Sequence, residues 1–153
     1  MANADGLRIS RSPVTQIEKT RVFISFDFDH DRDLKNLLVG QSRNSDSPFF
    51  IEDWSIKVES KGWRSNARKR IQLSDVMIVI CGLHTHEAVG VTAEIEIARE
   101  ADVRFCLLKG RNKGTVRRPK GTSWLFNELH PWTWKELQVI TTTKQRSRWA
   151  NIW

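Results

Sequence analysis

The stretch Val76–Cys81, which reads VMIVIC, decides the fold of this chain of 153 residues. It is a continuous apolar run bounded by Asp75 and Gly82. A strand covered on both faces has this composition, whereas a strand with one wet face alternates apolar and polar residues. The stretch therefore predicts a central strand of a parallel sheet.

The segments around it alternate between strand and helix patterns. Residues 21–28, RVFISFDF, predict a buried strand, because apolar or small residues occupy most of both faces. Apolar spacing predicts further strands at Phe49–Ile51 and 103–108, and helices at about 34–40, 62–74 and 91–98. A T-x-x-E capping box at Thr133 and Glu136 predicts the start of a last helix.

Such alternation with short connections is typical of a parallel sheet with right-handed crossovers. We predict an α/β, flavodoxin-like fold of three layers with strand order 2-1-3-4. Residues 124–126 are the candidate for a short fifth strand. Residues 1–19 lack periodicity and are expected to be a flexible leader, followed by one domain over 20–153.

Composition fits a globular domain of the cytoplasm. The apolar fraction of 39% and the charged fraction of 28% are ordinary, and the length allows a core without disulfides. Cys81 and Cys106 lie in or at the end of apolar runs, which favours buried thiols over a bridge or a metal site. No segment reaches the ~20 apolar residues of a membrane helix, so we expect no membrane partner.

The net charge of +7 is concentrated in one stretch: between Arg104 and Asn127 there are seven basic residues and no acidic one. We expect residues 104–120 to be largely exposed and not to read a specific nucleic acid, because no known nucleic-acid motif accompanies them. A weak nucleic-acid patch is the alternative. The positive electrostatic potential of these basic residues would also favour an anionic nucleotide substrate.

Polar residues gather where the predicted fold places ligands. In a sheet of order 2-1-3-4, the connections leave strands one and three in opposite directions and open a crevice at their carboxyl ends. The loops 26–31 (FDFDHD) and 82–87 (GLHTHE) follow these strands. For Asp31 and Asp33 we prefer a role at the N-terminus of the next helix.

Glu94 falls on the apolar side of the predicted third helix. At about 100° per residue it lies within the arc of Val91, Ile95 and Ala98, whereas Glu96 and Glu100 point away. Burial would raise the pKa of such a carboxyl towards the range useful in catalysis. An ion pair with a basic residue of the helix at 62–74 is an equal alternative.

Three stretches, in the same order along the chain as in the family, resemble the bacterial TIR-like domain family of Thoeris ThsB-like proteins. They are VFISFDFDHDRDLKNLL at 22–38, EDWS at 52–55, and VMIVICGLHTHEAVGV at 76–91 with the following AEIEIARE, and PWTW at 131–134 adds a weaker match. The resemblance implies a flavodoxin-like fold and cleavage of NAD, with nicotinamide released and a signal derived from ADP-ribose produced. NAD is then a substrate, no cofactor or metal is expected, and self-association through the domain is expected.

The same resemblance assigns the site. Glu94 matches the family glutamate that handles the ribose, where a carboxylate can stabilise an oxocarbenium-like centre. The expected substrate-binding residues are aromatic or polar: Phe26, Asp27, Phe28, Asp29, Trp54, Ser55, His84 and Thr85. For each of these, packing or loop structure is the alternative role.

Other functions stay open. The usual family pattern has a tryptophan shortly before the glutamate, where this chain has Gly90, so a catalytically silent module that senses a nucleotide or binds a protein is the main alternative. A nucleoside deoxyribosyltransferase would differ in its products. A receiver domain lacks its acceptor aspartate here, because Cys81 and Gly82 end the third strand. A metal site of Cys81, His84 and His86 is weakly supported.

Overall fold

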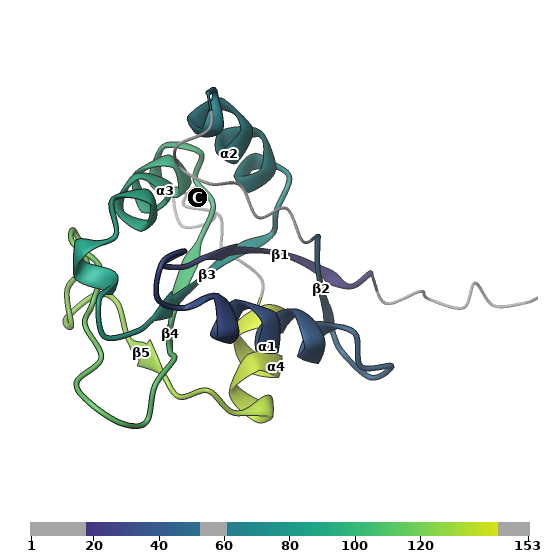
Figure 1. Cartoon of the computed structure of the whole chain (residues 1–153). Helices are drawn as coiled ribbons and strands as arrows, with labels where there is room; N and C mark the ends of the chain where they lie inside the picture. Colours follow the sequence, from purple (N-terminus) through teal and green to yellow (C-terminus); the bar gives the residue numbers. More distant parts are fainter. Residues whose placement is uncertain (1–17, 53–60, 144–153) are drawn as a thin grey trace, which may run out of the picture.

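The computed structural model describes residues 18–52 and 61–143. In this part the chain forms a five-stranded sheet with helices on both faces (Figure 1). The strand order is β2-β1-β3-β4-β5, and every neighbouring pair is parallel. The strands are β1 Thr20–Ser25, β2 Phe49–Ile51, β3 Val76–Cys81, β4 Phe105–Lys109 and β5 Leu129–His130. The predicted α/β, flavodoxin-like architecture is confirmed.

The helices form one layer on each face of the sheet. On one face lie α1 (Arg32–Ser42) and α4 (Trp134–Thr142), and on the other α2 (Trp63–Gln72) and α3 (Val89–Glu100) (Figure 1). Alternate residues of the strands face the two layers, so each layer has its own core. Ile78 and Ile80 pack with α1 and α4, whereas Met77 and Val79 pack with α2 and α3. All six residues of β3 are buried, as its composition predicts.

The first strand ends three residues earlier than predicted. It stops at Ser25, because Asp27 turns the chain: its carbonyl oxygen accepts from Asp31 N at 2.9 Å, and its Oδ1 accepts from Asp29 N at 3.1 Å. A carboxylate that bonds the backbone two residues on makes a turn of this kind. Residues 26–30 therefore form a loop at the carboxyl end of β1.

The fifth strand lies elsewhere than predicted. Residues 124–126 form a turn, and the strand is Leu129–His130. The capping box is half formed: Thr133 Oγ1 accepts from Glu136 N at 3.1 Å, but the Glu136 carboxylate binds His130 Nδ1 at 2.6 Å instead of Thr133 N. Most of the expected leader, residues 1–17, lies outside the described residues.

Candidate functional site

A cavity of about 420 Å³ lies at the carboxyl ends of β1 and β3, where the strand order predicts a crevice. The loop after β1 and the start of α1 form one wall, and the loop after β3 and the start of α3 form the other. Its described lining is Phe26, Asp27, Phe28, Asp29, His30, Arg32, His84, Glu87, Ala88, Val89, Gly90 and Val91. Five of the eight predicted substrate-binding residues are among them.

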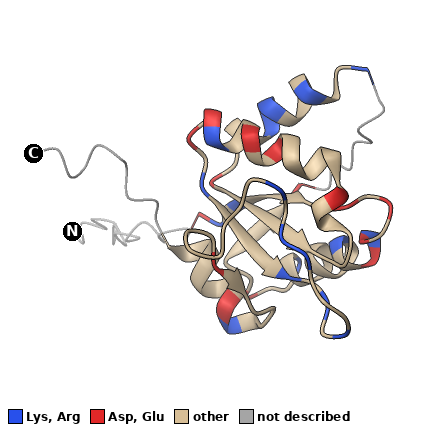
Figure 2. Cartoon of the chain, turned by 90° about the vertical axis from the view of Figure 1, so that its left-hand side faces the viewer, with Lys and Arg blue, Asp and Glu red and all other residues tan. Residues whose placement is uncertain are grey.

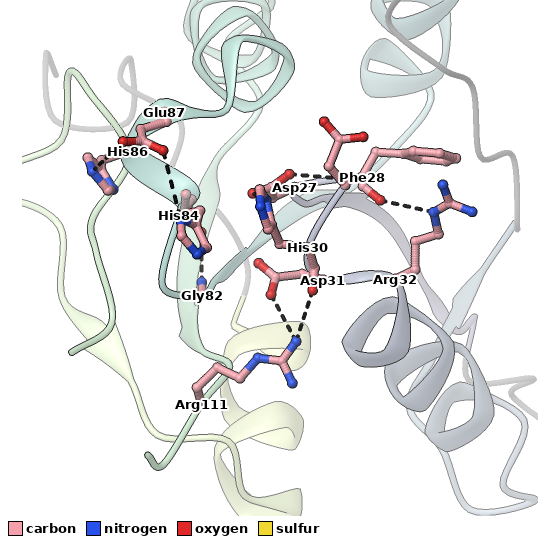
Figure 3. A network of polar contacts seen from close by, with 12 residues as sticks. Asp27, Phe28, His30, Asp31, Arg32, Gly82, His84, His86, Glu87 and Arg111 are labelled. Atoms are coloured by element: carbon pink, nitrogen blue, oxygen red, sulfur yellow. Dashed lines mark hydrogen bonds and ion pairs between the residues drawn. The ribbon is translucent and has the colours of Figure 1, made fainter. Parts of the chain in front are cut away.

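Two histidines join the walls. His30 and His84 stack with their ring centroids 4.1 Å apart, and His30 Nδ1 lies 2.7 Å from Asp27 Oδ2 (Figure 3). The hydrogen bond to Asp27 raises the pKa of His30, since it favours the protonated ring. Two exposed carboxylates, Asp29 and Glu87, line the cavity beside this imidazole.

Aromatic rings and a guanidinium form the rim of the β1 wall. Phe26 and Phe28 have centroids 6.1 Å apart, and the Arg32 guanidinium lies 4.0 Å from the centre of the Phe28 ring. Arg32 Nε also donates to the Phe28 carbonyl oxygen at 3.0 Å. Such a surface can stack an aromatic base while the cation meets a phosphate. Sequence reasoning missed Arg32, because its position at the cavity depends on how the turn at 28–30 enters α1.

The loop after β3 is fixed from within. Thr85 is buried, and its hydroxyl oxygen accepts from Gly82 N at 2.7 Å, so the hydroxyl holds the loop and does not line the cavity. His84 and His86 lie 3.7 Å and 3.5 Å from the Glu87 carboxylate.

Burial raises the pKa of the Cys81 thiol to about 12. The described residues hold no group of three His, Cys, Asp or Glu side chains placed for a metal ion.

Asp31, in the loop after β1, pairs with Arg111 in the loop after β4. Asp31 is 1% exposed, and Arg111 Nη2 donates to its Oδ1 at 3.1 Å and to the His30 carbonyl oxygen at 3.1 Å (Figure 3). Burial raises the pKa of Asp31 even so, whereas the hydrogen bond from Arg111 lowers that of Asp33. The Asp31 side chain does not cap α1. Both aspartates lie at the N-terminus of α1 as expected, Asp31 as the N-cap residue and Asp33 in the first turn, and both also pair with Arg111.

Glu94 lies one turn beyond the cavity lining on α3. It shares a helix face with Gly90 and Val91, which do line the cavity. The side chain is partly buried, and within the described residues it has no hydrogen bond or ion pair. Burial raises its pKa to about 8. The pairing between helices considered above exists, but Glu100 makes it, with Oε2 2.8 Å from Arg68 Nη2.

A second polar group without a partner faces the same layer. Ser25, the last residue of β1, is fully buried, and its hydroxyl has no hydrogen-bond partner in the described part of the chain. It is two residues from Phe23, which packs into the core of α2 and α3, so Ser25 also points to that side. The alternation of side chains along β1 could have indicated from the sequence that Ser25 points to that side. Trp54 and Ser55 lie outside the described residues.

Comparison with known families identifies the family to which this domain belongs. Residues 23–109, more than half of the chain, match the family described as Thoeris protein ThsB, TIR-like domain. The match begins in β1, contains both loops and α3, and ends in β4. A search of curated proteins found no match. Among the described residues, no helix has the length and apolar character needed to cross a membrane. The chain belongs to the family of TIR-like domains of the Thoeris protein ThsB.

Proposed function

We propose that this domain cleaves NAD, or a closely related nucleotide, between nicotinamide and ribose. The product would be a signal derived from ADP-ribose, in keeping with a TIR-like domain of bacterial defence signalling. The observation that carries the proposal is Glu94, a partly buried carboxyl group without a partner in the described residues, with a pKa of about 8. It lies one turn from a cavity of about 420 Å³.

The cavity suits a dinucleotide in its charge and surface. Phe26 and Phe28 offer an aromatic face, and Arg32 at its edge offers a cation for a phosphate. On the opposite wall Gly90 has no side chain, which leaves room for a ribose over the first turn of α3. From that position the ribose would have Glu94 below it, and the unpaired Ser25 hydroxyl faces the same layer.

The chemistry follows from the charge that develops. When the bond between C1′ and nitrogen breaks, both electrons leave with neutral nicotinamide, and positive charge develops on the ribose. An ionised carboxylate interacts more strongly with this developing positive charge in the transition state than with the ribose of the intact substrate, and so lowers the barrier to cleavage. A water molecule, or a nucleophile of the substrate itself, then bonds to C1′ and loses its proton. Because burial holds the Glu94 carboxyl protonated below about pH 8, only its ionised fraction would support the reaction.

The test is nicotinamide release by the purified chain over a range of protein concentrations, since the site can depend on self-association. We expect Glu94→Gln to lower release by about a hundredfold or more, because the amide keeps the shape and loses the charge. Glu96→Gln is the matched control, because Glu96 is exposed on the same helix. Turnover that survives in the Glu94→Gln variant would exclude this mechanism.

Nucleotide sensing without cleavage is the second candidate. It is favoured by the position of Glu94 beyond the described cavity lining, which ends on α3 at Val91. Calorimetry with ADP-ribose and NAD distinguishes the two. Binding that requires Arg32, with no nicotinamide released at any protein concentration, would establish sensing in place of cleavage.

A further inference from the structure

Three adjacent apolar side chains project into solvent in the loop between β4 and β5. Trp124, Leu125 and Phe126 are 74%, 65% and 86% exposed. Single exposed apolar residues are common on protein surfaces, but a contiguous group marks a site of interaction. We name Trp124, Leu125 and Phe126 the apolar turn. It contributes nothing to the lining of the cavity between β1 and β3.

The apolar turn is held in this exposed form by its own polar residues. Asn127 N donates to the Ser123 carbonyl oxygen at 2.7 Å, and Ser123 N donates to Asn127 Oδ1 at 3.1 Å. Leu125 N donates to Ser123 Oγ at 3.1 Å, and the Arg118 guanidinium donates to the Asn127 carbonyl oxygen. These hydrogen bonds hold the backbone of the turn while the three side chains face water. The sequence builds a defined turn whose apolar side chains have no place in the core.

The same loop carries exposed cations. Lys109, Lys113, Arg117 and Lys120 are exposed and have no ion pair within the described residues. Arg104, Arg111 and Arg118 are partly buried and bind the protein itself. No acidic residue occurs between Arg104 and Asn127. Figure 2 views the side of the molecule on which this loop lies, with Lys and Arg in blue. The partner of this surface must therefore be both anionic and able to accept apolar side chains.

We propose that the loop at 109–126 docks on the surface of an anionic lipid bilayer. A bilayer interface accepts tryptophan and phenylalanine without a matching pocket, and anionic headgroups neutralise basic residues beside them. A stable protein interface takes about 20–30 residues from each partner and is depleted of charged residues at its core, whereas this loop exposes four cations beside its apolar turn. The expectation of no membrane partner rested on the lack of a spanning segment, and peripheral docking needs none.

Co-sedimentation with vesicles tests the proposal. We expect the full chain to sediment with vesicles of phosphatidylglycerol and phosphatidylcholine, much less with phosphatidylcholine alone, and less as salt is added. The double variant Trp124→Ser/Phe126→Ser and the double variant Lys113→Gln/Lys120→Gln should each weaken binding about tenfold or more. All four side chains are exposed, so circular dichroism should show an unchanged fold. Leu73→Ser is the matched control, since Leu73 is 65% exposed on another face.

Several results would overturn the proposal. One is equal binding to vesicles with and without phosphatidylglycerol, and another is binding that survives in the apolar-turn variant. Single-stranded DNA or RNA that binds through the same residues and displaces the vesicles would identify a nucleic-acid surface instead, because aromatic side chains and cations also suit stacked bases. Nicotinamide release in the absence of vesicles is measured separately, so failure here leaves the proposed cleavage untouched.

Discussion

Replacing Glu94 by glutamine should stabilise the protein, and more so as the pH rises. The Glu94 carboxyl titrates near pH 4.5 in the unfolded chain and at about 8 in the fold, because burial disfavours its charged form. In that window the folded state binds more protons than the unfolded state, so the free energy of unfolding falls with rising pH. At about 1.36 kcal/mol per pH unit, the loss is about 3 kcal/mol at pH 7 and about 5 kcal/mol above pH 8.

Glutamine has the shape of the protonated acid and does not titrate. The variant and the wild type should therefore be equally stable near pH 4.5 and should diverge by up to these amounts towards pH 9. The values are upper bounds, because a partly buried carboxylate can turn towards water once it is charged. Urea unfolding at about pH 5, 7 and 9 measures the difference. Glu96→Gln should leave the pH dependence unchanged, since Glu96 is exposed.

The reasoning fails if the stability difference between wild type and Glu94→Gln is the same at every pH. That result would mean that the carboxylate is solvated or paired in solution, with an ordinary pKa. It would also remove the physical basis for a glutamate poised near neutral pH, whatever the variant did to nicotinamide release. The stability measurement thus tests the placement of Glu94 separately from its chemistry.

Three other outcomes are expected. Arg111→Met should cost about 2–3 kcal/mol in urea unfolding, because it leaves the buried Asp31 carboxylate without its cation, whereas Lys113→Met should change stability by less than ~0.5 kcal/mol. Gly82→Ala should lower the melting temperature, at a cost of about 1–3 kcal/mol, because a Cβ there would lie 2.2 Å from Asp31 Oδ2. The kcat/KM for nicotinamide release should rise with pH to a plateau above about 8, as Glu94 ionises, and a flat profile would contradict its role.

The centre of the sheet was predictable because β3 is buried on both faces. Val76–Cys81 has the predicted limits, since Asp75 and Gly82 bound its six apolar residues. The errors came from local polar hydrogen bonds that overrode an apolar pattern. Asp27 ends β1 early, and Ser123 with Asn127 folds an apolar tripeptide into a turn where the composition suggested a strand. Serine, asparagine and aspartate beside apolar runs are the signals that sequence reasoning underweighted.

The candidate site was predictable in part, for a related reason. The inward position of Glu94 follows from helical spacing alone, and the two loops follow from strand order. The contacts that shape the site depend on tertiary distance. Arg111 meets Asp31 across 80 residues of sequence, and His30 stacks on His84 from another loop. These two contacts cannot be predicted from the spacing or the composition of the sequence.

The contrast between Asp31 and Glu94 argues for a functional site at α3. Asp31 is buried and Glu94 is partly buried, and burial raises the pKa of each. The fold supplies Asp31 with Arg111, and this pair ties the loop after β1 to the loop after β4. Within the described residues it supplies Glu94 with no hydrogen bond or ion pair, and burying a carboxyl group without a partner costs free energy. Most residues of a folded chain favour its stability, and a carboxyl group buried without a partner does not. Residues of that kind are expected at functional sites, where the chemistry requires them.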